Sequence, residues 1–172
     1  MIEDRGLVER IDRSKTVISL INMDEVRQYC FILTTVEPWI YSSASQEQWT
    51  AHATSLIKTI ADIRSARLHH EGAAELLRLS QRYRYTCYQA AGMDDCWNML
   101  RSASLAYIRA SMLAMLLDEW RLGPLAYELL FAAARNPIDS PLGTAALLPR
   151  LLASKLKSLE QLASSYPYFF VS

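Results

Sequence analysis

Basic and aromatic residues alternate along one stretch of the sequence, and together they could hold single-stranded nucleic acid. Aromatic rings stack on bases, and guanidinium groups pair with phosphates. The same residues could instead form the rim of a helical bundle, with tyrosine rings buried and arginines paired to acids of the N-terminal region. We expect these residues to form the rim of the bundle. Binding of RNA or single-stranded DNA is therefore the second hypothesis, after protein binding. The residues are Arg78, Arg82, Tyr83, Arg84, Tyr85 and Tyr88.

Histidines, cysteines and glycines predict no metal, redox or phosphate site. His69 and His70 are adjacent, and neighbours on a helix point about 100° apart, so they cannot face one metal ion together. The three cysteines lack the paired spacing of a disulfide framework or a zinc site. No nucleophile motif and no glycine-rich phosphate loop is present. We therefore expect no cofactor, no metal and no enzymatic activity.

The run Asp94-Asp95-Cys96-Trp97-Asn98 resembles the aspartate-rich signature of class I terpene synthases. In that family, acidic side chains one turn apart coordinate magnesium, which binds a substrate diphosphate. The resemblance implies a small metal-dependent helical enzyme that uses Asp94, Asp95 and Asn98, and it covers five residues. Acidic residues at a helix start also stabilise the helix dipole by about 0.3–1 kcal/mol each. We favour this structural role, so the enzyme is the third hypothesis.

The C-terminal region carries two apolar features that could bind a protein partner or a second copy of the chain. Four aromatics, Tyr166, Tyr168, Phe169 and Phe170, lie within the tail at 166–172, where water would leave them prone to aggregation. They must pack on the chain's own body or on a partner. The helix before the tail repeats leucine at helical spacing, at Leu148, Leu152, Leu156 and Leu159. We predict a non-catalytic interaction module, such as an adaptor, regulatory or structural subunit, that uses these residues and the Arg/Tyr rim.

Composition fits a folded chain. Of the 172 residues, 51% are hydrophobic and 21% charged, and eighteen basic side chains balance eighteen acidic ones. This excludes intrinsic disorder and argues weakly against a dedicated nucleic-acid binder. Residues 1–47 carry eight acidic and five basic groups, whereas residues 48–109 carry five acidic and eight basic groups. We expect these two regions to pair with each other inside one domain, residues 1–172.

Helical spacing dominates the sequence and predicts an all-α compact bundle of six to seven helices. A helix at about 94–120 is apolar on nearly every face, so we expect it at the centre of the bundle. Its alanines at 103, 106, 110 and 114 form a seam for a neighbouring helix. Its one charge between residues 102 and 117, Arg109, needs a carboxylate or several carbonyls unless it reaches outward.

Other helices are expected around this centre. Ser45 and Gln48 have capping-box spacing and start a helix that runs to about His70. Further helices are predicted at 73–91, at 125–135 and at 141–164. Gly92 ends the first of these, and Asp94 caps the helix that comes next. Pro149 kinks or divides the helix at 141–164. Residues 4–36 suggest a helical hairpin that stops before Pro38. Their β-branched runs also permit strands, and the sequence leaves this choice open.

No membrane span or signal peptide is predicted. The longest apolar stretch, residues 103–117, is shorter than the roughly 20 residues that a span needs. The acidic N-terminus lacks an apolar segment. Together with unpaired cysteines, this predicts a cytoplasmic or other reducing intracellular compartment.

Overall fold

A computed structural model describes residues 8–12, 15–69, 72–117 and 141–171, and it confirms the all-α class. The described helices are α1 (Met23–Ser43), α2 (Gln46–Leu68), α3 (Ala73–Ala90), α4 (Asp94–Ser102), α5 (Leu105–Leu116) and α8 (Pro141–Ser165), with a short 3₁₀ helix η2 (Pro167–Phe169). The strands are β1 (Val8–Asp12), β2 (Lys15–Ile18), β3 (Ile21–Asn22) and β4 (Phe170–Val171). The predicted helix at 125–135 lies outside the described residues.

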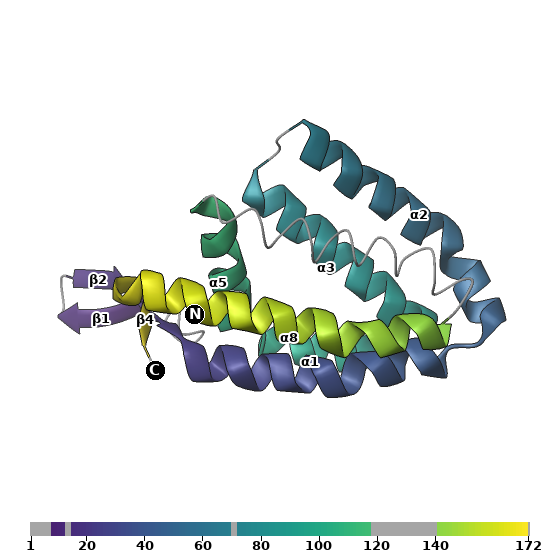
Figure 1. Cartoon of the computed structure of the whole chain (residues 1–172), viewed down its shortest axis with the longest axis horizontal. Coiled ribbons are helices and arrows are strands. Elements are labelled where there is room, and N and C mark those ends of the chain that lie inside the picture. Colours follow the sequence, from purple (N-terminus) through teal and green to yellow (C-terminus); the bar gives the residue numbers. More distant parts are fainter. Residues whose placement is uncertain (1–7, 13–14, 70–71, 118–140, 172) are drawn as a thin grey trace.

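The long helices α1 and α8 run antiparallel, side by side, along one edge of the molecule (Figure 1). Helix α2 packs against α3 as a second pair, and α5 touches α1, α3 and α8. A large apolar cluster joins α1, α3, α5 and α8, and a smaller one, around Ile63 and Leu76, joins α2, α3 and α5. The strands gather at the end of the bundle where α1 begins and α8 ends.

Helix α1 begins at a side-chain cap and continues through a proline. The Asn22 Oδ1 atom accepts from the backbone N–H groups of Asp24, at 2.9 Å, and Glu25, at 3.3 Å. The prediction that the helix stops before Pro38 is wrong, because α1 extends to Ser43. A proline removes one hydrogen bond, and the burial of Val26, Leu33 and Ile40 along the same helix outweighs that loss.

Two predicted helix boundaries of the middle region are confirmed. Ser45 Oγ accepts from the Gln48 N–H, and the Gln48 side chain accepts from the Ser45 N–H, which is a capping box. Helix α3 ends at Gly92, whose φ of 68° is left-handed. The bonds from Met93 N to Tyr88 O and from Gly92 N to Gln89 O complete this C-terminal motif. The cap of α4 is Met93, so the prediction of Asp94 is wrong by one residue.

The predicted central helix at about 94–120 is two helices, α4 and α5, separated at Ala103 and Ser104. The Ser102 and Ser104 hydroxyls donate to the carbonyls of Met99 and Arg101, at 2.6 and 2.7 Å. Such local bonds compete with regular helix, and they accompany the break here. α5 still lies among three helices, with Ala106 and Ala110 buried, but Ala103 at the break is exposed.

The N-terminal region is a strand hairpin followed by a helix, so the predicted helical hairpin at 4–36 is wrong. β1 pairs antiparallel with β2, with Val8 opposite Ile18. The β-branched run that left strands open as an alternative supplies β2. The predicted helix at 141–164 is confirmed as α8, which stays helical through Pro149.

Candidate functional site

Five large apolar side chains are exposed together at the strand end of the bundle. One ends β2, one lies between β2 and β3, and three follow α8. They are Ile18, Leu20, Tyr168, Phe169 and Val171, and we call this group the end surface. It contains five of the eleven exposed large hydrophobic residues that the described part of the chain presents. Exposed apolar side chains scattered singly are ordinary, whereas a contiguous group marks a binding surface.

The pairing of β3 with β4 brings the two parts of the end surface together. These strands are parallel, with Ile21 opposite Phe170 and Asn22 opposite Val171. Ile21 and Phe170 are both buried and belong to the main apolar cluster. Successive side chains of a strand point to opposite faces, so Leu20 and Val171 point away from the bundle. Phe170 is thus the predicted tail residue that anchors the tail to the chain's own body.

The segment before β3 is inverted relative to an ordinary amphipathic strand. Ser19 is 8% exposed, whereas its apolar neighbours Ile18 and Leu20 are 77% and 48% exposed. The cause is Arg109 of α5, whose guanidinium donates to the Ser19 hydroxyl at 3.0 Å and also to the Ser19 carbonyl. This answers how the single charge of α5 is satisfied, and it holds two apolar side chains outward.

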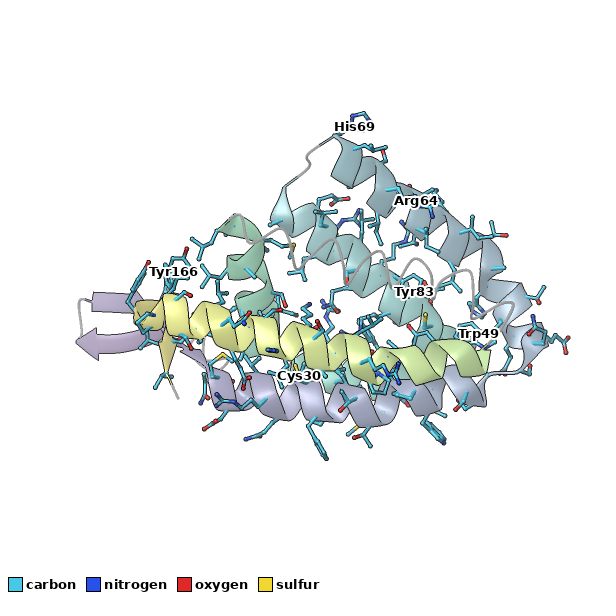
Figure 2. All side chains as sticks on the ribbon, viewed as in Figure 1. Cys30, Trp49, Arg64, His69, Tyr83 and Tyr166 are labelled. Carbon is cyan, nitrogen blue, oxygen red and sulfur yellow. The ribbon has the colours of Figure 1, made fainter. Side chains whose placement is uncertain are left out.

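The aromatic part of the end surface is a row of rings in mutual contact. The ring centroids of Tyr168 and Phe169 are 4.5 Å apart, and those of Tyr166 and Tyr168 are 6.2 Å apart with a T-shaped geometry. Tyr166 lies where α8 ends, beside the strands (Figure 2). Pro167 starts η2, and the Phe169 N–H donates to the Tyr166 carbonyl at 3.1 Å. Tyr168 is therefore held at 65% exposure by short-range geometry.

The five residues of the end surface are uncharged, and the ion pairs that Arg27 makes within α1 and with α8 lie outside this group. Arg27 of α1 donates to Asp24 at 2.8 Å and to Glu160 of α8 at 3.0 Å. Hydrogen bonds from Arg27 to Glu160 and Asp24 raise the pKa of this guanidinium. An uncharged aromatic and aliphatic centre with ion pairs outside it is the usual anatomy of a protein interface.

Three of the predicted Arg/Tyr rim residues lie inside the bundle, where they pack within the chain in the conformation described. Tyr83, Arg84 and Tyr88 are all buried. Arg84 donates through Nε to the Glu37 carboxylate at 2.6 Å, and a second guanidinium nitrogen contacts the same oxygen. Burial opposes the charge on Arg84, and Glu37 overcomes this, so the pKa of Arg84 is raised well above its usual value. This pair confirms that an acid of residues 1–47 pairs with a base of residues 48–109.

The other three rim residues are accessible and have partners within the chain. Arg78 donates to Glu75 at 2.7 Å, and Arg82 lies 3.6 Å from Asp62 of α2. Tyr85 is half-buried, with its ring centroid 5.8 Å from that of Trp97. RNA phosphates at this surface would have to compete with the carboxylates of Glu75 and Asp62 for the two arginines.

The predicted leucine face is part of the core. Leu148, Leu152 and Leu159 are buried in the main apolar cluster, and Leu156 packs partly buried against it. They belong to α8, whose main neighbour is α1. In the conformation described, the face that was predicted to contact a partner therefore packs on the chain's own body.

No group of three or more metal-binding side chains occurs among the residues that the structure describes. Asp94, Asp95 and Asn98 of the terpene-synthase-like motif are exposed at the start of α4. The thiols of Cys30 and Cys87 are buried, and burial raises their pKa to about 11 and about 12. These cysteines are therefore protonated at neutral pH.

A groove of about 950 Å³ lies between α1 and the α4–α5 junction. Its lining includes Glu25 and Gln28 from α1, and Asn98, Arg101 and Leu105 from the junction. It combines a carboxylate, a guanidinium and amides, and it is open to solvent. This mixture does not single out one kind of ligand.

Comparisons of the sequence with protein-family models and with curated proteins find no match. In the part of the chain that the structure describes, no helix is long and apolar enough to cross a membrane.

Sequence reasoning missed three members of the end surface: Ile18, Leu20 and Val171. Their types are those of core residues, and an alternating strand pattern places Ile18 and Leu20 inside. Only the long-range bond from Arg109 to Ser19 reverses this assignment. The opposite charge imbalances of residues 1–47 and 48–109 predict ion pairs between these two regions. They do not identify Glu37 and Arg84 as the residues that pair.

Proposed function

We propose that the chain is a non-catalytic protein-binding module and that the end surface is where it binds. The observation that carries this proposal is the inverted segment, in which Ser19 is buried while Ile18 and Leu20 face outward. In a free monomer, the bonds that Arg109 donates to Ser19 leave Ile18 and Leu20 in water, so the apolar surface of these two side chains contributes nothing to stability. A partner that covers Ile18 and Leu20 accounts for the arrangement.

The surface also has the chemistry of an interface centre. Tyrosine and phenylalanine supply large contact area with few rotatable bonds, and they are enriched where binding energy concentrates. Phe170 and Arg109 fix the two halves of the end surface in place, which reduces the entropy lost on binding. The free thiols support a reducing intracellular compartment as part of this proposal.

Site-specific photo-crosslinking tests the proposal. The photoreactive residue p-benzoylphenylalanine replaces Tyr168 in one variant and Trp39 in a control variant, since Trp39 is a comparably exposed aromatic of α1 at 56%. We expect irradiation of intact cells to give protein adducts from position 168 and not from position 39. Equal adducts from both positions, or none from position 168, would contradict the proposal.

RNA binding through Arg78, Arg82 and Tyr85 is the second candidate, and no contact favours it over their observed pairing. Its affinity would fall steeply with ionic strength. The matching measurement is the ratio of absorbance at 260 and 280 nm for the chain purified at low and high salt.

A further inference from the structure

We propose that the end surface binds the end surface of a second copy of this chain and forms a two-fold symmetric dimer. This inference rests on the proposed protein-binding function and names its partner. The end surface has an aliphatic half, Ile18 and Leu20, and an aromatic half, Tyr168 and Phe169. We place the aromatic half of each copy on the aliphatic half of the other, because a two-fold axis repeats this contact and it then covers all four side chains in both copies.

The area of the end surface matches what a modest dimer needs. Large side chains cover about 150–250 Å² each, so the exposed fractions of the five residues leave roughly 500 Å² of apolar surface. That is at the upper part of the range of about 300–600 Å² for the largest apolar patch of a typical monomer. Two copies together bury roughly 1,000 Å², which is the lower limit of a specific interface. The dimer is therefore expected to exchange with monomer at micromolar concentration.

Charge also favours a second copy over a charged partner. None of the five residues is charged, and the chain carries eighteen basic and eighteen acidic side chains. Two copies therefore approach without net repulsion, and a protein of zero net charge tends to associate with itself. A strongly basic or acidic partner would find no complementary charge within the end surface itself.

The proposed contact between the aromatic half and the aliphatic half can be tested by mixing two variants that each lack one half. One variant, Tyr168→Ser/Phe169→Ser, lacks the aromatic half, and the other, Ile18→Ser/Leu20→Ser, lacks the aliphatic half. A homodimer of either variant loses both copies of the contact. A heterodimer of the two retains one complete contact, with the aromatic half of the second variant on the aliphatic half of the first.

Sedimentation equilibrium of the full chain measures these associations, and circular dichroism checks that each variant is folded. We expect a concentration-dependent wild-type dimer, and dissociation constants at least about a hundredfold higher for each variant alone. The equimolar mixture should associate more tightly than either variant. The matched control Phe31→Ser/Trp39→Ser, which removes two exposed aromatics of α1, should dimerise like the wild type. The wild-type dimer should also persist in high salt, because no ion pair holds it.

Several outcomes would overturn the dimer. One is a wild-type chain that stays monomeric up to hundreds of micromolar, and another is an equal loss of association in the Phe31 and Trp39 control. A mixture no tighter than its components would rule out the aromatic-on-aliphatic contact. A monomer whose position 168 still crosslinks to a different protein would overturn self-association and leave the protein-binding function standing. Absence of both dimer and adducts would overturn both.

Discussion

Breaking the buried ion pair between α1 and α3 should be among the most damaging changes in this protein. Glu37 is 2% exposed and Arg84 8% exposed, with 2.6 Å between Oε1 and Nε. Two unit charges about 3 Å apart attract by roughly 5 kcal/mol at an effective dielectric constant of about 20. Arg84→Met loses this attraction and leaves the carboxylate dehydrated, so the free energy of unfolding should fall by about 3–5 kcal/mol.

The stacking of Arg84 adds a smaller contribution. Its guanidinium carbon lies 5.4 Å from the ring centroid of the buried Trp97, a cation–π contact of about 2 kcal/mol at such a desolvated site. The double variant Glu37→Leu/Arg84→Met removes both charges, and methionine and leucine fill similar volume. Because no unpaired charge then remains in the interior, the free energy of unfolding of the double variant should lie within about 1 kcal/mol of the wild-type value or above it.

Urea unfolding followed by circular dichroism, at pH 7 and 25 °C, measures the free energy of unfolding of the wild type, the single variant and the double variant. The matched control is Arg78→Met, because Arg78 pairs with Glu75 on the surface at 59% side-chain exposure. That change should cost less than about 0.5 kcal/mol. If Arg84→Met costs as little as Arg78→Met, or if the double variant is as unstable as the single one, Glu37 and Arg84 are not an energetically coupled buried pair.

Four further predictions concern a helix cap, a turn and, for the last two, the thiols. Asn22→Ala removes the side-chain acceptor for two backbone N–H groups of α1 and should lower thermal stability by about 1 kcal/mol, whereas no change would mean that water replaces the cap. Gly92→Ala places a side chain at a φ of 68° and should cost about 1 kcal/mol in urea unfolding, but Gly72→Ala, at a φ of −65°, should cost less than half as much. Burial raises the pKa of Cys87 from 9.0 to about 12, so iodoacetamide at pH 8 should label the partly exposed Cys96 and spare Cys87, as mass spectrometry can verify. The same shift stabilises the fold fully below pH 9, where the unfolded thiol is still protonated, and the stability should fall as pH rises toward about 12; a flat alkaline profile would argue against it.

The parts of the fold that local patterns determine were predictable. The Ser45–Gln48 capping box, the left-handed Gly92 and the leucine spacing of α8 each act within a few residues. These features depend on backbone geometry and hydrophobic periodicity, which the sequence displays directly. The boundaries of α2, α3 and α8 therefore agree with prediction to within two residues at each end.

The parts that depend on distant contacts were not predictable. Pro38 is accommodated because the rest of α1 is buried against other helices, and this support comes from elsewhere in the chain. Ser19 is turned inward by an arginine ninety positions away. Arg84 and Tyr88 belong to a sequence typical of a surface, yet a single acid at Glu37 makes an interior position tolerable. In each case the deciding partner is identifiable only in three dimensions.

The pairing of Ile21 with Phe170 joins segments from nearly opposite ends of the sequence. On a ribosome, β3 and α1 emerge well before α8 and β4, which pack against them. The apolar side of α1 therefore stays exposed until α8 has been synthesised. Contacts between segments so far apart in sequence form slowly, and the exposed apolar surface makes the nascent chain prone to aggregation. Because both halves of the end surface are needed to complete it, an unfinished chain cannot present the whole surface. If the proposed association occurs, only a chain that has been translated through β4 and has paired it with β3 would be competent for it.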